Sequence, residues 1–229
     1  MDYVFTPPTR PSLPIVGSEA RFPVRRVYCV GRNYSAHAVE MGLTEHPDPF
    51  FFTKPADAVF VPQGPVPYPP ATRSLHHEVE LVVALARGGA DIDPADAAGH
   101  IYGYALGIDL TRRDLQNSFR ELGRPWDMAK GFTSAGPCTP IRPAADCFPD
   151  GVRGAIRLSV NGTMRQDGRL EDMILGVGEI LAALSRFDRL AAGDMVFTGT
   201  PAGVGELHAG DTVQADIDTV GSLEFEITD

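Results

Sequence analysis

The sequence predicts an α+β fold in which strands dominate, and three observations support this. Apolar segments of strand length recur along the chain, whereas few segments have helical periodicity. Gly (24) and Pro (20) are frequent, which favours turn-rich sheets over a helix bundle. With 229 residues, of which 43% are hydrophobic, the chain is long enough to bury a core as one large domain.

The first third of the chain is predicted to hold an extended arm, one strand and several loops. Residues 1–22 are rich in proline and are expected to form an arm ahead of a single domain over residues 23–229. A strand is expected at residues 24–30 and one or two helical turns at residues 35–41. Prolines recur too often in residues 47–70 for a helix, which leaves loops with short edge strands.

The middle of the chain holds the strongest strand pattern. Residues 77–85 begin polar and become apolar on both faces, as a buried central strand does. A second buried strand at residues 101–110 runs into a helix predicted over residues 111–122. Thr111 and Asp114 have the spacing of a helix-capping box, with Asp in place of the usual Glu.

The last third combines a hairpin, a helix and closing strands. Asn161-Gly162 favours a tight turn between strands at residues 155–160 and 163–166. Residues 170–186 form the best helix, with one apolar stripe made of Ile174, Val177, Leu181 and Leu184. Strands are expected at residues 195–198, 212–218 and 222–228.

Charge, cysteine content and the lack of long apolar segments argue against several classes of protein. The net charge of -10 argues against nucleic acid as a partner, because phosphate binding needs clustered Lys and Arg. The chain has three cysteines, Cys29, Cys138 and Cys147, and none of them forms a CxxC pair. An odd number without that spacing indicates reduced thiols, as in a cytoplasmic protein. The N-terminus lacks a signal-peptide pattern, and no apolar segment reaches the ~18 residues that a membrane helix needs. We therefore expect a soluble cytoplasmic protein.

Glu78 and Glu80 are the first candidates for chemistry. Residues two apart in a strand share a face, so the two carboxylates emerge side by side. They would raise one another's pKa unless a cation sat between them, and oxygen-only ligands suit Mg²⁺, Mn²⁺ or Ca²⁺. The alternative is a solvated edge strand that displays two acids. The apolar residues that follow indicate burial, which makes an unpaired carboxylate pair costly.

Asp109 is the natural third ligand, because it ends an apolar strand at the start of the next predicted helix. A plain capping acid at the helix N-terminus is its alternative role. His76 and His77 adjoin the acidic pair and are either ligands or structural residues. With an acid they would also suit an Fe(II) oxygenase, which is a remote alternative.

His37 and Glu40 are candidates for acid–base chemistry. On a helical turn, positions i and i+3 are neighbours, and a carboxylate can orient an imidazole that acts as a general base. A surface ion pair is the alternative. Lys130 lies among small and apolar residues, where it would pair with an acid or hold a substrate anion. A surface lysine is an equally good interpretation of that pattern.

Six motifs in order resemble the fumarylacetoacetate hydrolase family: VGRNYxxHxxEM, FFTKP, HHExEL, GYxxGxDxTxRDxQ, PWxxAKxF and FTGTPxGVG. They run from about residue 27 to residue 204. The resemblance implies a mixed β-roll fold, a homodimer, and Mg²⁺ or Mn²⁺ on the matching Glu78, Glu80 and Asp109. It also implies a His37–Glu40 dyad on a lid segment around residues 32–50.

The same resemblance implies that Arg32, Gln116, Lys130 and Thr200 contact substrate or hold the site together. The family includes acylpyruvate hydrolases, oxaloacetate decarboxylases or tautomerases, and isomerases of aromatic degradation. GIDLTRRDLQ and GRPWDMAK are most similar to the fumarylpyruvate hydrolases of the gentisate route. Many relatives have Ala where this chain has Arg112, a difference that bears on substrate and not on the metal.

The leading hypothesis is therefore metal-dependent hydrolysis of a 2,4-diketo acid, most specifically of fumarylpyruvate to fumarate and pyruvate. In this hypothesis His37, oriented by Glu40, activates a water, and Lys130 offsets the developing charge. Arg112 or Arg124 would bind the distal carboxylate, unless both form surface ion pairs. The alternatives are another acylpyruvase, an oxaloacetate decarboxylase or tautomerase on the same scaffold, and a non-catalytic metal-binding protein.

Overall fold

The computed structural model of the chain describes residues 2–34 and 50–229. Its largest sheet has six strands in the order β12-β9-β8-β15-β3-β4. Within it, β8 runs antiparallel to both β9 and β15, and β15 pairs parallel with β3. The strands are β3 (Val27–Gly31), β4 (Phe50–Lys54), β8 (Val79–Leu85), β9 (Ile101–Ile108), β12 (Arg142–Pro143) and β15 (Met195–Phe197).

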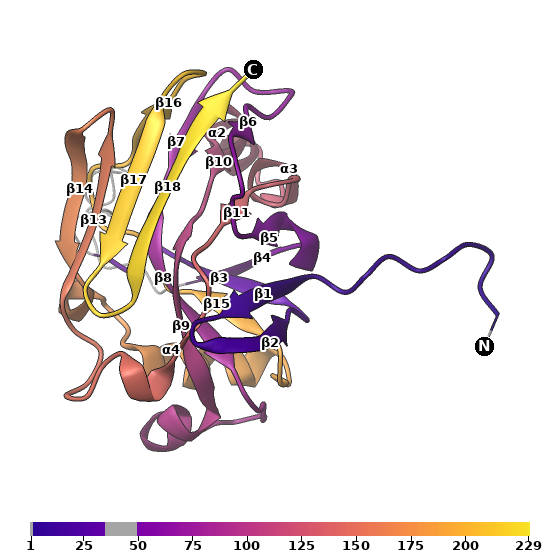
Figure 1. Cartoon of the computed structure of the whole chain (residues 1–229), viewed down its shortest axis with the longest axis vertical. Helices are drawn as coiled ribbons and strands as arrows, with labels where there is room; N and C mark the ends of the chain where they lie inside the picture. The colour runs from indigo at the N-terminus through magenta and orange to yellow at the C-terminus, as the bar shows by residue number, and fades with distance from the viewer. Residues whose placement is uncertain (1, 35–49) are drawn as a thin grey trace.

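A five-stranded sheet in the order β14-β13-β17-β18-β6 lies beside the six-stranded sheet (Figure 1). Its β13 contacts β8, and its β17 and β18 contact β9. Asn161 and Gly162 both have positive φ, so the predicted tight turn between β13 and β14 is confirmed. The strands are β6 (Val66–Pro67), β13 (Ala155–Val160), β14 (Thr163–Arg169), β17 (Thr212–Ile217) and β18 (Gly221–Thr228).

Smaller sheets and short helices complete the described part of the chain. A three-stranded sheet contains β7 (Leu75–His77), β10 (Thr111–Arg112) and β16 (Gly205–Leu207); two-stranded sheets pair β1 (Ser12–Ile15) with β2 (Ser18–Pro23), and β5 (Val59–Phe60) with β11 (Gly136–Pro137). The α-helices are α2 (Arg113–Glu121), α3 (Asp127–Lys130) and α4 (Val177–Phe187). The 3₁₀ helices are η1 (Ala56–Ala58), η2 (Pro94–His100), η3 (Ala144–Asp146) and η4 (Leu170–Asp172).

The prediction of an α+β fold dominated by strands is confirmed. Among the described residues, every helix is too short or too polar to cross a membrane.

Alternate residues of β8 face two different cores. Leu81 and Val83 pack with side chains of β13, β17, β18 and α4, whereas Val82 and Ala84 pack with the β1–β2 hairpin. All of β8 is buried, as predicted for a central strand. A fully buried side chain of this size contributes roughly 1.5–3 kcal/mol, so both cores stabilise the strand. Because residues two apart share a face, Glu80 projects on the side of the hairpin core.

The predicted arm over residues 1–22 needs correction. Residues 2–10 are exposed and extend away from the body of the molecule (Figure 1), but residues 12–23 form the β1–β2 hairpin. Gly17, with a φ of 74°, makes its turn, and Leu13 and Phe22 are buried in the core. The prolines at positions 14 and 23 misled the prediction, because a two-stranded edge pairing tolerates them.

Two helix boundaries also differ from the sequence prediction. The helix predicted over residues 170–186 begins at Val177, because residues 170–172 form the short η4. The helix predicted over residues 111–122 begins at Arg113 and has no capping box. Instead, Thr111 Oγ1 donates to Asp109 O, and Asp114 accepts hydrogen bonds from Thr72 Oγ1 and from a backbone N–H.

Candidate active site

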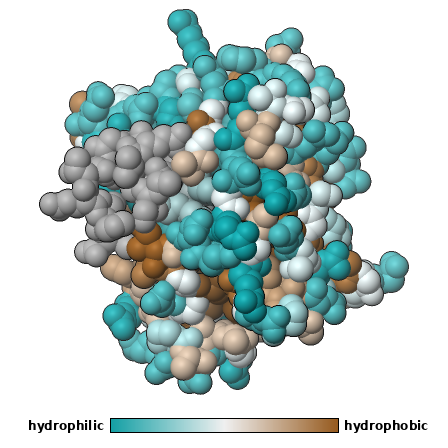
Figure 2. Space-filling model, turned by 90° about the vertical axis from the view of Figure 1, so that its left-hand side faces the viewer, coloured by the Kyte–Doolittle hydropathy of each residue, from teal (hydrophilic) through white to brown (hydrophobic). Residues whose placement is uncertain are grey.

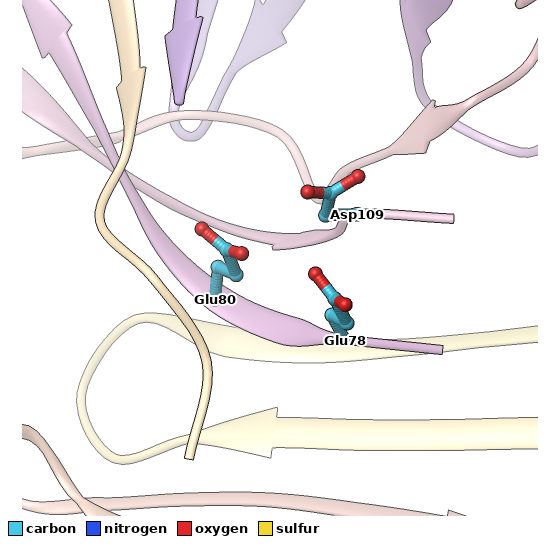
Figure 3. Close-up of side chains that lie close together, drawn as sticks. All are labelled: Glu78, Glu80 and Asp109. Atoms are coloured by element: carbon cyan, nitrogen blue, oxygen red, sulfur yellow. The ribbon is translucent and has the colours of Figure 1, made fainter. Parts of the chain in front are cut away.

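Three carboxylates converge where β8 and β9 meet the small β7 sheet. Glu78, immediately before β8, and Glu80, within it, project to the same side, and Asp109 projects toward them from the position just after β9 (Figure 3). The Asp109 N–H donates to Glu78 O at 2.8 Å, which sets the register of the two segments. One ligand oxygen from each carboxylate lies within 4.8 Å of the others. The sequence argument from strand alternation therefore holds for the first two acids.

The chemistry of this donor set fits a hard divalent cation. Glu78, Glu80 and Asp109 are 5%, 2% and 0% exposed, so they are not a solvated acidic edge. Burial, with Asp109 and Glu78 close by, raises the pKa of Glu80 well above its usual range. A cation among the three oxygens would offset the free-energy cost of keeping these buried carboxylates ionised side by side. Oxygen-only ligands suit Mg²⁺ or Mn²⁺. These residues could hold such an ion.

Lys130 lies inside the acidic cluster. Its Nζ donates to Glu78 Oε2 and to Asp109 Oδ2, both at 2.7 Å, and also to Thr111 Oγ1 at 2.7 Å. Burial alone would lower the pKa of Lys130, but the carboxylates of Asp109 and Glu78 outweigh it and raise the pKa. The side chain is 2% exposed, so the surface-lysine interpretation does not hold.

Two further cations complete the cluster, and the sequence argument assigned neither. Lys54 Nζ lies 2.7 Å from Asp109 Oδ1, and Arg113 donates through Nη2 to Glu78 Oε1. With Lys130, these residues set three positive charges against the three carboxylates. Both stood in motifs of the sequence, Lys54 in FFTKP and Arg113 in TRRD. Lys54 could have been found from the sequence, because it is an isolated lysine at the end of an aromatic strand.

A loop after β15 supports Glu80 from the other side. Gly199 N donates to Glu80 Oε2 at 2.7 Å, and Gly199 has a φ of 96°. A side chain there would collide with Asn33, since an added Cβ would lie 2.8 Å from Asn33 Cβ. Asn33 in turn donates to Thr198 O at 2.9 Å, which holds the loop. Thr200 Oγ1 donates to Val79 O at 2.8 Å.

A pocket opens onto the carboxylates. It is lined by the three acids together with Val30, Gly31, Arg32, Phe52, Arg113, Gln116, Trp126, Lys130 and Thr200. Arg32, Gln116, Lys130 and Thr200 were all expected near the site, and all four line this pocket. Arg32 has a φ of 64° and lies 5.4 Å from the centre of the Phe50 ring. A left-handed conformation is unusual for an arginine and often occurs at functional sites.

The two arginines considered for the distal carboxylate lie in different places. Arg124 lines a second pocket with Phe50–Thr53, Pro125, Trp126 and Asp127, and this pocket shares Phe52 and Trp126 with the first. Arg112 lines neither of the two. It donates through Nη1 to Met128 O at 3.0 Å, and its guanidinium lies 4.4 Å from the centre of the Phe132 ring. Arg112 therefore supports the segment around α3.

The histidines separate into two groups. His37 and Glu40, with most of the predicted lid at residues 32–50, lie outside the described residues. His76 and His77 are not part of the cluster of possible ligands among the described residues. Burial, followed by the charge of Arg113, lowers the pKa of His76 to about 4. His77 Nδ1 is bonded to Gln166 at 2.9 Å. Within residues 2–34 and 50–229, His76 and His77 therefore do not form the ligand set that an Fe(II) oxygenase needs.

Comparison with known proteins gives one consistent family. The family described as fumarylacetoacetate (FAA) hydrolase C-terminal matches residues 26–228. The oxaloacetate tautomerase FAHD1 of Rattus norvegicus mitochondria is 41% identical over 89% of this chain and 91% of its own length. The oxaloacetate tautomerase YcgM of Escherichia coli is 39% identical over 88% and 92%.

Two solved structures resemble the chain over 99% or more of its length. A fumarylpyruvate hydrolase from Pseudomonas aeruginosa, solved in complex with Mn²⁺ and pyruvate, is 46% identical with a TM-score of 0.96 over 99% of both chains. A Burkholderia cenocepacia protein with a proposed fumarylpyruvate hydrolase activity is 51% identical, with a TM-score of 0.92 over 100% of this chain and 99% of its own.

Proposed function

Because this chain belongs to the fumarylacetoacetate hydrolase family, we propose that it is a Mg²⁺- or Mn²⁺-dependent hydrolase of 2,4-diketo acids. Fumarylpyruvate is the substrate that we propose, with fumarate and pyruvate as products. The observation that carries this choice is the Pseudomonas aeruginosa relative, a fumarylpyruvate hydrolase solved with Mn²⁺ and pyruvate. Its 46% identity extends over 99% of both chains.

Glu78, Glu80 and Asp109 are the residues that would hold the cation. When bound there, the cation would act as a Lewis acid that stabilises the pyruvate enolate as it leaves. The surrounding side chains suit this task. Lys54, Lys130 and Arg113 balance the three carboxylates, so a loaded site would be net positive and would match the dianionic enolate. Lys130, which lines the pocket, would also offset charge that develops on the substrate.

Water activation is assigned to His37, oriented by Glu40. This assignment comes from the sequence motif, since neither residue belongs to the described part of the chain. The base would take a proton from water as its oxygen attacks the C4 carbonyl. The bond between C3 and C4 then breaks, and its electron pair stays with the pyruvate enolate, which is protonated to pyruvate. No covalent enzyme intermediate is required.

Oxaloacetate tautomerisation is the second candidate. The relatives from Rattus norvegicus and Escherichia coli, at 41% and 39% identity, are both oxaloacetate tautomerases. Tautomerisation needs proton transfer between carbon and oxygen but no attack by water. The same cation site and pocket could serve it, because oxaloacetate is also a 2-oxo acid.

An assay with three substrates separates the two candidates. The purified protein would be loaded with Mg²⁺ or Mn²⁺ and given fumarylpyruvate, acetylpyruvate and enol-oxaloacetate in turn. We expect the highest kcat/KM with fumarylpyruvate, with fumarate and pyruvate formed in equal amounts. Keto–enol conversion of oxaloacetate without pyruvate release from either acylpyruvate would favour the tautomerase instead. The homodimer and the cytoplasmic location stay predictions from the sequence.

A further inference from the structure

Gln166 is a fully buried amide on an otherwise exposed strand. The other residues of β14 are exposed or half-buried, and Figure 2 shows that this side of the molecule is mainly hydrophilic. Gln166, by contrast, is 0% exposed. A buried amide needs partners for its oxygen and for its N–H groups, so its hydrogen bonds show what it holds in place.

The Gln166 oxygen binds the junction between β7 and β8. Val79 N donates to Oε1 at 3.1 Å, and His77 Nδ1 lies 2.9 Å from the same atom. Because the Val79 N–H can only donate, Oε1 is the acceptor and His77 Nδ1 carries a proton. β7 and β8 belong to different sheets, so the chain changes sheet at Glu78. Gln166 thus binds the residues on both sides of Glu78, at the point where the chain passes from one sheet to the other.

The Gln166 nitrogen binds the loop on the other side of the site. Nε2 donates to Thr200 Oγ1 at 2.8 Å and to Pro201 O at 2.9 Å. One residue earlier, Gly199 N donates to Glu80 Oε2 at 2.7 Å. The single amide therefore joins the strand segment that carries two carboxylates to the loop that binds the second of them.

We propose that Gln166 is a positioning residue for the cation site. Its four hydrogen bonds fix the spacing between the Glu78–Glu80 segment and the loop at residues 199–201. Gln166 does not line the pocket, so it acts through these neighbours and not on substrate. Residues that orient metal ligands in this way change metal affinity or activity about 10- to 100-fold when they are replaced. The inference rests on the cation site of the proposed function.

The test measures Mn²⁺ affinity by calorimetry, independently of any substrate. Gln166→Met removes all four hydrogen bonds, and Gln166→Glu keeps the size and the acceptor oxygen while it removes the two donors. The matched control is Gln214→Met on β17, where Nε2 donates at 2.8 Å to the exposed Glu224. We expect the Kd for Mn²⁺ to rise at least about tenfold in Gln166→Met and at least about threefold in Gln166→Glu. The control should keep the wild-type Kd.

The outcomes separate positioning from a purely structural role. Tm is measured in parallel, and all Kd values are taken well below the lowest Tm. The proposal would be overturned if the Kd for Mn²⁺ rose less than about tenfold in folded Gln166→Met, or less than about threefold in folded Gln166→Glu. A Gln166→Glu protein that cannot fold would also overturn it, because the amide would then serve folding alone. If the wild-type protein itself binds no Mn²⁺, the proposed function fails instead.

Discussion

Lys54 Nζ lies 2.7 Å from Asp109 Oδ1, and both side chains are fully buried. The other oxygen of Asp109, Oδ2, accepts from Lys130 Nζ at 2.7 Å. Lys54 also donates to the Lys130 backbone carbonyl, so the two lysines form one unit around a single carboxylate. This arrangement fixes the plane of the Asp109 carboxylate while leaving lone pairs on both oxygens for a cation.

Replacing Lys54 with Met should therefore damage both stability and cation binding. Removing one partner of a buried ion pair typically costs about 3–5 kcal/mol, because the other charge is left uncompensated. We expect chemical denaturation to show a fall of that size in the free energy of unfolding, and calorimetry to show a raised Kd for Mn²⁺. Arg25→Met is the control: it breaks the ion pair of Arg25 with the buried Asp194, at 2.9 Å. Similar Kd values for the two variants would contradict the role of Lys54.

The three proposed ligands make a sharper prediction. Glu78→Gln, Glu80→Gln and Asp109→Asn each remove a charged oxygen, so each should weaken Mn²⁺ binding and abolish turnover. Calorimetry with Mn²⁺ and an assay of pyruvate release would measure the two effects. Full activity of the wild-type protein in excess EDTA would refute the metal-dependent mechanism.

His37→Ala should separate chemistry from binding. Loss of a general base typically lowers kcat by about 10²–10⁴, while His37 is not among the three proposed cation ligands. We expect an unchanged Kd for Mn²⁺ and an almost unchanged KM, with a large fall in kcat. Glu40→Gln should show the same pattern more mildly, because the carboxylate only orients the base. A His37→Ala protein that lost Mn²⁺ but kept its kcat at saturating Mn²⁺ would show that the assignment is wrong.

The acidic cluster was predictable because its logic is local. Strand alternation alone puts Glu78 and Glu80 on one face, and an acid that ends an apolar strand, as Asp109 does, is a strong signal. Arg32, Gln116, Lys130 and Thr200 could be carried over from the family motifs. Arg32 and Thr200 follow strands β3 and β15, whereas Gln116 and Lys130 lie on the short helices α2 and α3, and each of the four stands inside a motif that fixes its position in the chain.

The residues that hold the cluster together were not predictable in the same way. Gln166 lies on a strand with an exposed pattern, and its partners are far from it in sequence. Lys54 ends β4 and Asp109 follows β9, two strands that are not neighbours in the sheet, so neither segment signals their contact. The β1–β2 hairpin was missed because proline content outweighed the weak alternation of Leu13 and Ile15. Each of these features depends on long-range pairing, which a pattern within one segment does not encode.

The three cysteines should be inert in the native protein. Cys29, Cys138 and Cys147 are each at most 1% exposed, and burial raises the pKa of Cys147 to about 11 and the pKa of Cys29 well above its usual range. The thiolate is the reactive form, and a raised pKa keeps the thiol protonated at pH 8. We expect no reaction with an aromatic disulfide reagent at pH 8 and reaction of all three thiols in denaturant. Rapid labelling of the folded protein would contradict the burial.

Substrate choice gives the last prediction, which concerns Arg124. Fumarylpyruvate carries a second carboxylate at its far end, where acetylpyruvate has only a methyl group. A cation at that end would favour fumarylpyruvate, and the planar fork of an arginine can bind a carboxylate through two hydrogen bonds. Arg124 is placed for this role, since its pocket shares Phe52 and Trp126 with the pocket that opens onto the carboxylates.

Arg124→Ala should lower kcat/KM for fumarylpyruvate roughly 10- to 100-fold, the range for a lost hydrogen bond to a charged group, with little change for acetylpyruvate. Arg153→Ala is a suitable control, because Arg153 is an exposed arginine that pairs with Asp150 at 3.5 Å. It should leave both substrates unaffected. Equal losses on the two substrates in Arg124→Ala would indicate that the arginine supports the pocket wall around Trp126, and no loss on either would remove it from the site altogether. Only a loss confined to the substrate with the distal carboxylate fits direct recognition by its guanidinium.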